Sequence, residues 1–112
     1  MSNRIDFSEH DQFSVVVVEG EVDLSWSAEL RNAVLEALKG SNNLLVDLSA
    51  VSYIDSSGIA ALVEGLQTAK AQGKTFGLVS VSAPARAVLE LARLDQVFAI
   101  HQDLAAAGNA AQ

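Results

Sequence analysis

Short β-branched stretches alternate with helix-patterned stretches along most of this chain, and this alternation narrows the possible folds more than any other feature. The stretch FSVVVVEGEVD contains four consecutive valines and runs into Gly20, a pattern typical of a buried strand. Because helical stretches separate the apolar ones, successive strands are expected to pair in parallel through right-handed crossovers. We predict a single α/β domain with helices packed on a mostly parallel sheet of four or five strands.

The spacing of apolar residues gives approximate bounds for these elements. From Ile59 the apolar residues recur at i, i+3, i+4 and i+7, which predicts a helix that ends near Gly73. The other predicted elements are strands at 13–20, 42–49, 74–81 and 96–100, helices at 24–40 and 83–94, and an edge strand at 4–9. The domain is expected to span 1–103, followed by a frayed or disordered tail at 104–112, where most side chains are small.

Charge and composition exclude several classes of function. Seven basic against fourteen acidic residues give a formal charge of −7, which opposes binding to nucleic acid. The chain has no cysteine, so disulfides and thiolate metal sites are excluded. Its apolar runs are much shorter than the roughly 20 residues that a membrane-spanning helix needs, and its first residues lack the apolar stretch of a signal peptide. We therefore expect a soluble, cytoplasmic protein that does not insert into membranes.

The polar cluster Asp55-Ser56-Ser57-Gly58 lies between a predicted strand and a predicted helix. Asp55 suits the N-cap, where a carboxylate accepts from unpaired backbone N–H groups. Ser57 can be first-turn polar filler, and Gly58 can allow close packing against the sheet. A cap needs only one acceptor, however, and a hydroxyl at Ser56 should face solvent, where the positive end of the helix would tolerate a phosphate. The residues alone leave both a simple cap and a modification site open.

Asp23 lies just past the end of the valine-rich strand, as Asp55 lies past the end of the next one. The helix between these strands makes the crossover, so the strands are expected to be neighbours. Loops that follow parallel strands emerge at one edge of the sheet, where ligand and partner sites usually form. We predict that these two acidic loops lie side by side.

No catalytic pattern involves these residues. The chain has no G-x-S-x-G elbow, and His10 and His101 stand near its two ends. The QGKT stretch lacks the first glycine of a phosphate loop, because Thr68 occupies that position, and a strand follows it instead of a helix. A phospho-aspartyl receiver site would need an acidic pair after the first strand and a lysine after the last, and the last strand ends in FAIHQD, without a lysine. We predict no enzymatic activity, no cofactor and no metal, with a cation between Asp23 and Asp55 as a minor alternative.

Four motifs together resemble the STAS domain of bacterial anti-sigma factor antagonists, over about residues 5 to 103. They are G-E-x-D after the valine strand, D-L-S-x-V-x-x-[IM]-D-S-S-G-[IL] around Ser56, Q-G-K before the third predicted parallel strand, and a closing L-x-x-V-F. The resemblance implies the STAS fold and a role in regulating transcription through protein partners.

The same resemblance implies a phosphorylation-controlled partner switch. The serine after the aspartate, here Ser56, is phosphorylated by a partner that is both anti-sigma factor and serine kinase, and a metal-dependent serine phosphatase resets it. The ATP belongs to the kinase, and the unphosphorylated form binds the kinase and frees a sigma factor. The residues expected to bind the partner are Asp23, Trp26, Asp55, Ser56, Ser57 and Gly58.

Trp26 and Leu24 make the start of the predicted first helix more apolar than expected there. Trp26 either staples the helix to the sheet or is an exposed aromatic anchor for a partner. A second class of function is also open, because STAS-like domains serve as cytoplasmic accessory subunits of phospholipid-transport ABC complexes. The intact D-S-S-G sequence favours the switch.

Overall fold

The four consecutive valines lie in β2 (Phe13–Val22), which has a strand on each side in the computed structural model. The structure describes residues 3–110 and contains a five-stranded sheet in the order β1-β2-β3-β4-β5. β1 runs antiparallel to β2, and the other neighbouring pairs are parallel, which confirms the predicted α/β fold with a mostly parallel sheet. The other strands are β1 (Arg4–His10), β3 (Asn43–Ile54), β4 (Phe76–Val79) and β5 (Ala99–His101).

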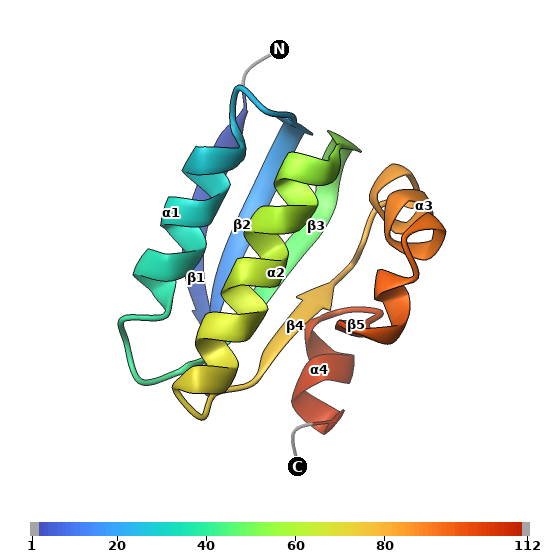
Figure 1. Cartoon of the computed structure of the whole chain (residues 1–112). Helices are drawn as coiled ribbons and strands as arrows, with labels where there is room; N and C mark the ends of the chain where they lie inside the picture. Colours follow the sequence, from blue (N-terminus) through green and yellow to red (C-terminus); the bar gives the residue numbers. More distant parts are fainter. Residues whose placement is uncertain (1–2, 111–112) are drawn as a thin grey trace.

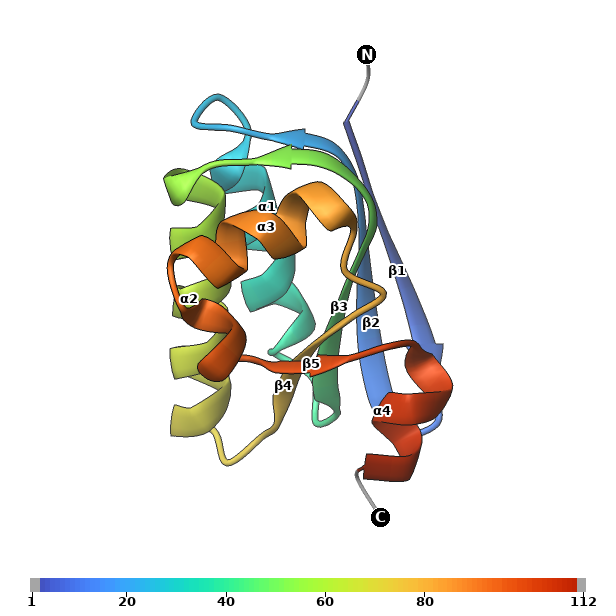
Figure 2. The ribbon, with the colours of Figure 1, turned by 90° about the vertical axis from the view of Figure 1, so that its right-hand side faces the viewer.

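Three helices cover one face of the sheet and a fourth lies on the other face (Figure 1 and Figure 2). The three are α1 (Ser27–Ala37), α2 (Ser56–Ala71) and α3 (Ala83–Leu91). Their buried residues form the main core with alternate residues of the strands, such as Val16 and Val18 of β2. Val15 points to the opposite face and belongs to a second, smaller cluster. The alternation of side chains along a strand therefore divides the valine run between two cores.

The helices α1 and α2 pack closely because α2 has a glycine at their contact. A Cβ at Gly65 would lie 2.5 Å from Val34 Cγ1 of α1 and 2.8 Å from Phe76 Cε2 of β4. Lys74 ties the following loop to the end of α1, since its Nζ donates to the carbonyls of Leu38, at 2.6 Å, and Gly40. The lysine of the QGKT stretch thus binds the C-terminal carbonyls of a helix, a common lysine contact.

Two register shifts bend β2 and β3 near their carboxyl ends. The shifts occur between Val17 and Glu19 and between Gly20 and Glu21 of β2. Bulges of this kind increase local twist and redirect a strand. Figure 2 shows that both strands curve toward the helix side and reach over the start of α1 and α2. The bend carries the two acidic loops to the amino ends of these helices.

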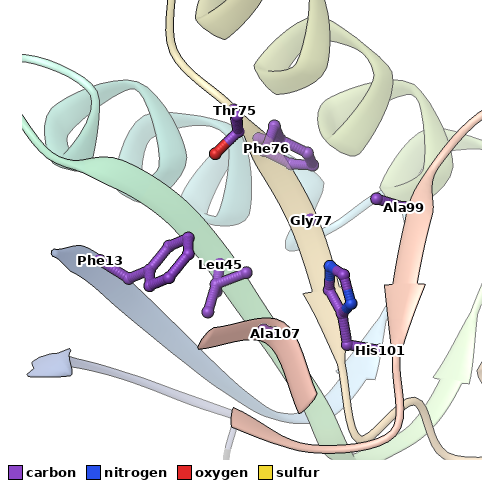
Figure 3. A pocket seen from close by; sticks show the side chains of 8 residues that line it. All are labelled: Phe13, Leu45, Thr75, Phe76, Gly77, Ala99, His101 and Ala107. Atoms are coloured by element: carbon purple, nitrogen blue, oxygen red, sulfur yellow. The ribbon is translucent and has the colours of Figure 1, made fainter. Parts of the chain in front are cut away.

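The C-terminal segment differs from the frayed tail expected at 104–112. Residues 104–110 form α4 (Leu104–Ala110), and the last two residues lie outside the described part of the chain. Ala107 of α4 is buried and Leu104 is half-buried against Phe13, Val15, Leu45 and Val79. Small residues pack here because the far face of the sheet presents an apolar surface that the helix covers. A hollow of about 190 Å³ remains beside α4, with Gly77 and His101 in its wall (Figure 3).

Some element bounds also differ from those predicted. β5 covers only three residues, and a short 3₁₀ turn, Leu94–Gln96, occupies the start of the region predicted as a strand. α1 begins at Ser27, three residues later than predicted, because the backbone from Asp23 to Trp26 forms a hydrogen-bonded turn. β3 continues five residues beyond the predicted end at Ser49 and stops directly before Asp55.

Candidate phosphorylation and partner-binding site

The ends of β2 and β3 bring the two acidic loops together. Val22 pairs in register with Ile54, and the N–H of Asp55 donates to the carbonyl of Val22 at 3.2 Å. Asp23 and Asp55 therefore follow the ends of hydrogen-bonded neighbours, as their positions after two parallel strands predicted. Figure 1 shows these strand ends beside the starts of α1 and α2.

Asp55 is the N-cap of α2. Its backbone is extended, and its Oδ1 accepts from the N–H of Ser57 at 2.9 Å and from the N–H of Gly58 at 3.3 Å. The hydroxyl of Ser57 donates to the same oxygen at 2.5 Å. These bonds satisfy two N–H groups that the first turn of a helix leaves without an intrahelical partner.

The same contacts shift the acidity of Asp55. The Ser57 hydroxyl lowers the pKa of Asp55 below its ordinary value, because it donates to the ionised carboxylate. Partial desolvation raises this pKa, and the backbone groups of Gly58, Ser57 and Leu24 lower it further. Leu24, the last of these, belongs to the loop after β2.

Ser56 and Ser57 differ in what their hydroxyls contact. Ser57 is half-buried and its hydroxyl is engaged by Asp55. Ser56 is exposed as the first residue of α2, and its hydroxyl makes no hydrogen bond within residues 3–110. The sequence alone offered two adjacent hydroxyls, and the structure leaves one of them accessible.

Asp23 organises the loop that enters α1. Its Oδ1 accepts from the N–H of Ser25 at 3.0 Å and from the Ser25 hydroxyl at 2.6 Å. Its carbonyl accepts from the N–H groups of Trp26 at 3.0 Å and Ser27 at 2.8 Å. Asp-x-Ser at this loop thus forms the same side-chain turn as Asp-x-Ser at Asp55. The carboxylate of Asp23 is half-exposed at the loop surface.

Trp26 and Leu24 have different environments. Trp26 is half-buried and packs against the main core, as the staple interpretation predicts, although part of its surface remains accessible. Leu24 is 78% exposed and belongs to the same loop as Asp23. Tyr53, 48% exposed, precedes the end of β3. Sequence reasoning named Leu24 only as unusually apolar and did not select Tyr53, because half-exposed residues in a curved strand end follow no simple pattern.

Gly58 contributes to the site by packing. It was expected among the partner-binding residues, but it is buried. A Cβ at this position would lie 2.7 Å from Ile54 Cγ1 and 2.8 Å from Val22 Cγ1, so no larger residue fits without displacement. The glycine lets α2 begin directly over the ends of β2 and β3. We call the accessible residues Asp23, Leu24, Asp55 and Ser56 the Ser56 surface.

The Ser56 surface lies apart from the hollow beside α4. The hollow in Figure 3 lies at the amino ends of the parallel strands, where Phe13, Leu45 and Phe76 stand, whereas Ser56 follows the carboxyl end of β3. Within residues 3–110, no group of three or more histidine or acidic side chains is arranged to hold a metal ion. No helix in this range is long and apolar enough to cross a membrane.

The structure is a small α/β domain that carries the Ser56 surface at one edge of its sheet. The family model described as "Mlab, STAS domain" matches residues 5–104. The chain belongs to the STAS-domain family of anti-sigma factor antagonists.

Several similar proteins are named anti-sigma factor antagonists. The anti-sigma-F factor antagonist RsfB of Mycobacterium tuberculosis is 29% identical over 92% of this chain and 84% of its own length. An anti-sigma-B factor antagonist of Staphylococcus epidermidis is 31% identical over 73% of this chain and 77% of its own length. The crystal structure of an anti-sigma factor antagonist from Mycobacterium paratuberculosis superposes with a TM-score of 0.86 and 32% identity, covering 97% of this chain and 93% of that one.

Replacing Asp55 with asparagine should make the stability of the protein less dependent on acid pH. Asparagine still accepts backbone N–H groups at an N-cap, but it carries no charge. The folded protein has a lowered Asp55 pKa, so the stabilisation by the ionised form is complete above the unfolded-state pKa. It is lost as the pH falls through the lower folded-state pKa. Denaturant unfolding from neutral to strongly acidic pH should show the two proteins converging in acid. A difference that stayed constant across this range would contradict the assignment.

Proposed function

We propose that this chain is an anti-sigma factor antagonist that acts in the cytoplasm as a phosphorylation-controlled partner switch. Its unphosphorylated form binds an anti-sigma factor that is also a serine kinase. Phosphorylation of Ser56 releases this partner, and a metal-dependent serine phosphatase restores the binding form. The names of the relatives support the antagonist role, and the switch rests on the geometry at Ser56.

The accessible hydroxyl of Ser56 is the observation that carries the proposal. It stands at the first position of α2, where unpaired N–H groups and the helix dipole favour negative charge. Asp55 holds the helix start through Ser57 and Gly58, so the cap does not depend on the Ser56 side chain. A phosphate at Ser56 would therefore leave the fold intact while adding about −1.5 to −2 charges to the surface.

The neighbouring residues give the other parts of the switch. Asp55 caps α2 and fixes the direction of Ser56, whereas Asp23 and Leu24 add an acidic and an apolar group from the adjacent loop. An apolar anchor beside charged groups is the usual composition of a specific protein interface. We assign Ser57 and Gly58 to the support of this surface, and Trp26 to its border with the core.

Phosphorylation by the cognate serine kinase tests this proposal. The chain would be incubated with ATP and the histidine-kinase-like serine kinase encoded near its gene, and the modified residue would be mapped by mass spectrometry. We expect phosphate on Ser56 in the wild type and in Ser57→Ala, and none in Ser56→Ala. Phosphate on Ser57, or an unmodified chain after incubation with the kinase that binds it, would refute the switch.

A second candidate is an accessory subunit of a phospholipid-transport ABC complex. The Mlab description of the matching family model is the observation that favours it. In that role the Ser56 surface would dock onto the transporter ATPase, and phosphorylation would have no part. Affinity capture from the native cell distinguishes the two, because a soluble kinase or phosphatase supports the switch and a transporter ATPase supports the accessory subunit.

A further inference from the structure

The outer strand β1 presents an unpaired backbone edge. It lies at one end of the strand order and pairs only with β2 over seven residues, Arg4–His10. At the other end, β5 has only three residues. Folded proteins usually protect a long edge by shortening, bulging, covering or charging it, because its free N–H and C=O groups can pair with another strand. β1 carries charged side chains, but its sequence RIDFSEH contains no proline and its regular pairing with β2 shows no bulge.

An aromatic side chain stands at the middle of this edge. Phe7 is 58% exposed, and it pairs with Val16, whose side chain belongs to the core on the helix side of the sheet. Phe7 therefore projects on the same side as α1. A hollow of about 170 Å³ adjoins it, between the β1–β2 hairpin and Ala37 near the end of α1. A projecting ring and a hollow on one edge are the two halves of a self-complementary contact.

We propose that a second copy of this chain adds its β1 antiparallel to this edge, with the two-fold axis at Phe7. The axis must run perpendicular to the sheet, so residues on one face meet residues on the same face of the second copy. Phe7 then lies opposite Phe7 of the second copy, and each ring can enter the hollow beside the other. Ile5 lies opposite Glu9, Asp6 opposite Ser8, and Arg4 opposite His10.

The charges on β1 favour this register over its neighbours. Centred on Phe7, the pairing places no two carboxylates directly opposite each other, and Arg4 Nε is already 2.9 Å from Asp6 Oδ2 within one copy. Residues that lie opposite each other must project from the same face of the sheet, so one strand can shift along the other only by two residues at a time. The next register in one direction sets Asp6 against Asp6, and the next in the other direction sets Phe7 against Glu9.

The pairing is independent of the proposed switch. β1 is separated from β3, and so from Ser56, by β2. A dimer built at β1 therefore leaves both Ser56 surfaces accessible. An absent dimer would not contradict the switch, and an unmodified Ser56 would not contradict the dimer. Since each copy carries a formal charge of −7, the copies repel at long range, and the dimer should strengthen as ionic strength rises.

Single-cysteine variants test the register directly, because the chain has no cysteine of its own. A mixture of Asp6→Cys and Ser8→Cys keeps Phe7 and places a thiol of one copy opposite a thiol of the other, because the proposed register pairs these two exposed positions. Mild oxidation of the mixture should give a disulfide-linked dimer on a non-reducing gel. Leu91→Cys is the matched control, since Leu91 is 89% exposed at the end of α3. Equal yields of dimer from the mixture and from Leu91→Cys, or no dimer from either, would overturn the proposal.

Light scattering after size exclusion gives a second measurement on the unmodified protein. The wild type should form a concentration-dependent dimer, and Phe7→Glu should weaken it by about 30-fold, the effect of losing an aromatic hot spot. Leu91→Glu carries the same charge change and should behave as the wild type. A wild type that stays monomeric at all concentrations would refute the proposal. Equal weakening of the dimer by Phe7→Glu and Leu91→Glu would also refute it. Should Phe7→Glu fail to fold, the cysteine pair remains decisive.

Discussion

Ser56→Asp should bind the anti-sigma factor kinase about 100-fold more weakly than the wild type, whereas Ser56→Ala should bind it as well as the wild type. The aspartate places a permanent charge at the first position of α2, next to the carboxylates of Asp55 and Asp23. Like charges placed close together at an interface cost several kcal/mol of binding free energy. Alanine removes only a hydroxyl that has no partner within residues 3–110. Titration calorimetry with the purified kinase would measure both affinities.

The control for this experiment adds the same charge at the other end of the sheet. Ser41 is exposed between α1 and β3, near the amino end of β3. Ser41→Asp should therefore leave the affinity unchanged, and circular dichroism should show native structure in all three variants. Equal weakening by Ser41→Asp would mean that net charge governs binding, and an unaffected Ser56→Asp would remove Ser56 from the interface.

The sequence was most informative where a local rule and the overall topology agree. The apolar spacing from Ile59 predicted α2, and an aspartate before it predicted the cap, because both depend on interactions within a few residues. The adjacency of Asp23 and Asp55 required only that two parallel strands be joined by one helix. These simple requirements place Asp23, Asp55 and Ser56 at one edge of the sheet.

The remaining features depend on contacts between distant segments. The sequence could not say which serine hydroxyl is engaged, because the answer depends on how Asp55 turns toward Ser57. The extension of β3 beyond Ser49 accompanies register shifts against β2, which depend on pairing between distant segments and have no local sequence signal. α4 packs mainly through Ala107 and Leu104, so its position depends on the apolar face that β2–β4 present. Its small residues gave no periodic signal of this contact.

Gly58→Ala should lower both the stability of the protein and its binding to the kinase. The added methyl gains about 1 kcal/mol of helix propensity, but overpacking a buried contact costs about 1–3 kcal/mol. The steric cost should prevail, because the methyl would meet Ile54 and Val22, which are almost completely buried. Relief requires α2 to move away from the strand ends, which displaces Ser56 from Asp23. We expect binding and phosphorylation of Ser56 to fall at least about tenfold, since small misplacements at a recognition site have large effects.

The Gly65→Ala variant shows whether weaker kinase binding comes from displacement of Ser56 or from lower stability of the fold. Its methyl would meet Val34 and Phe76 in a similarly close contact, about two and a half helical turns from Ser56. Urea unfolding should show both variants destabilised by a comparable amount, whereas only Gly58→Ala should impair kinase binding under conditions in which both are folded. If Gly65→Ala impaired binding equally, stability alone would explain the effect. If neither did, the exact placement of the α2 start would not matter to the partner. The distinct outcome for Gly58 follows from its place beneath the Ser56 surface, where its close packing against Ile54 and Val22 sets the position of the Ser56 hydroxyl.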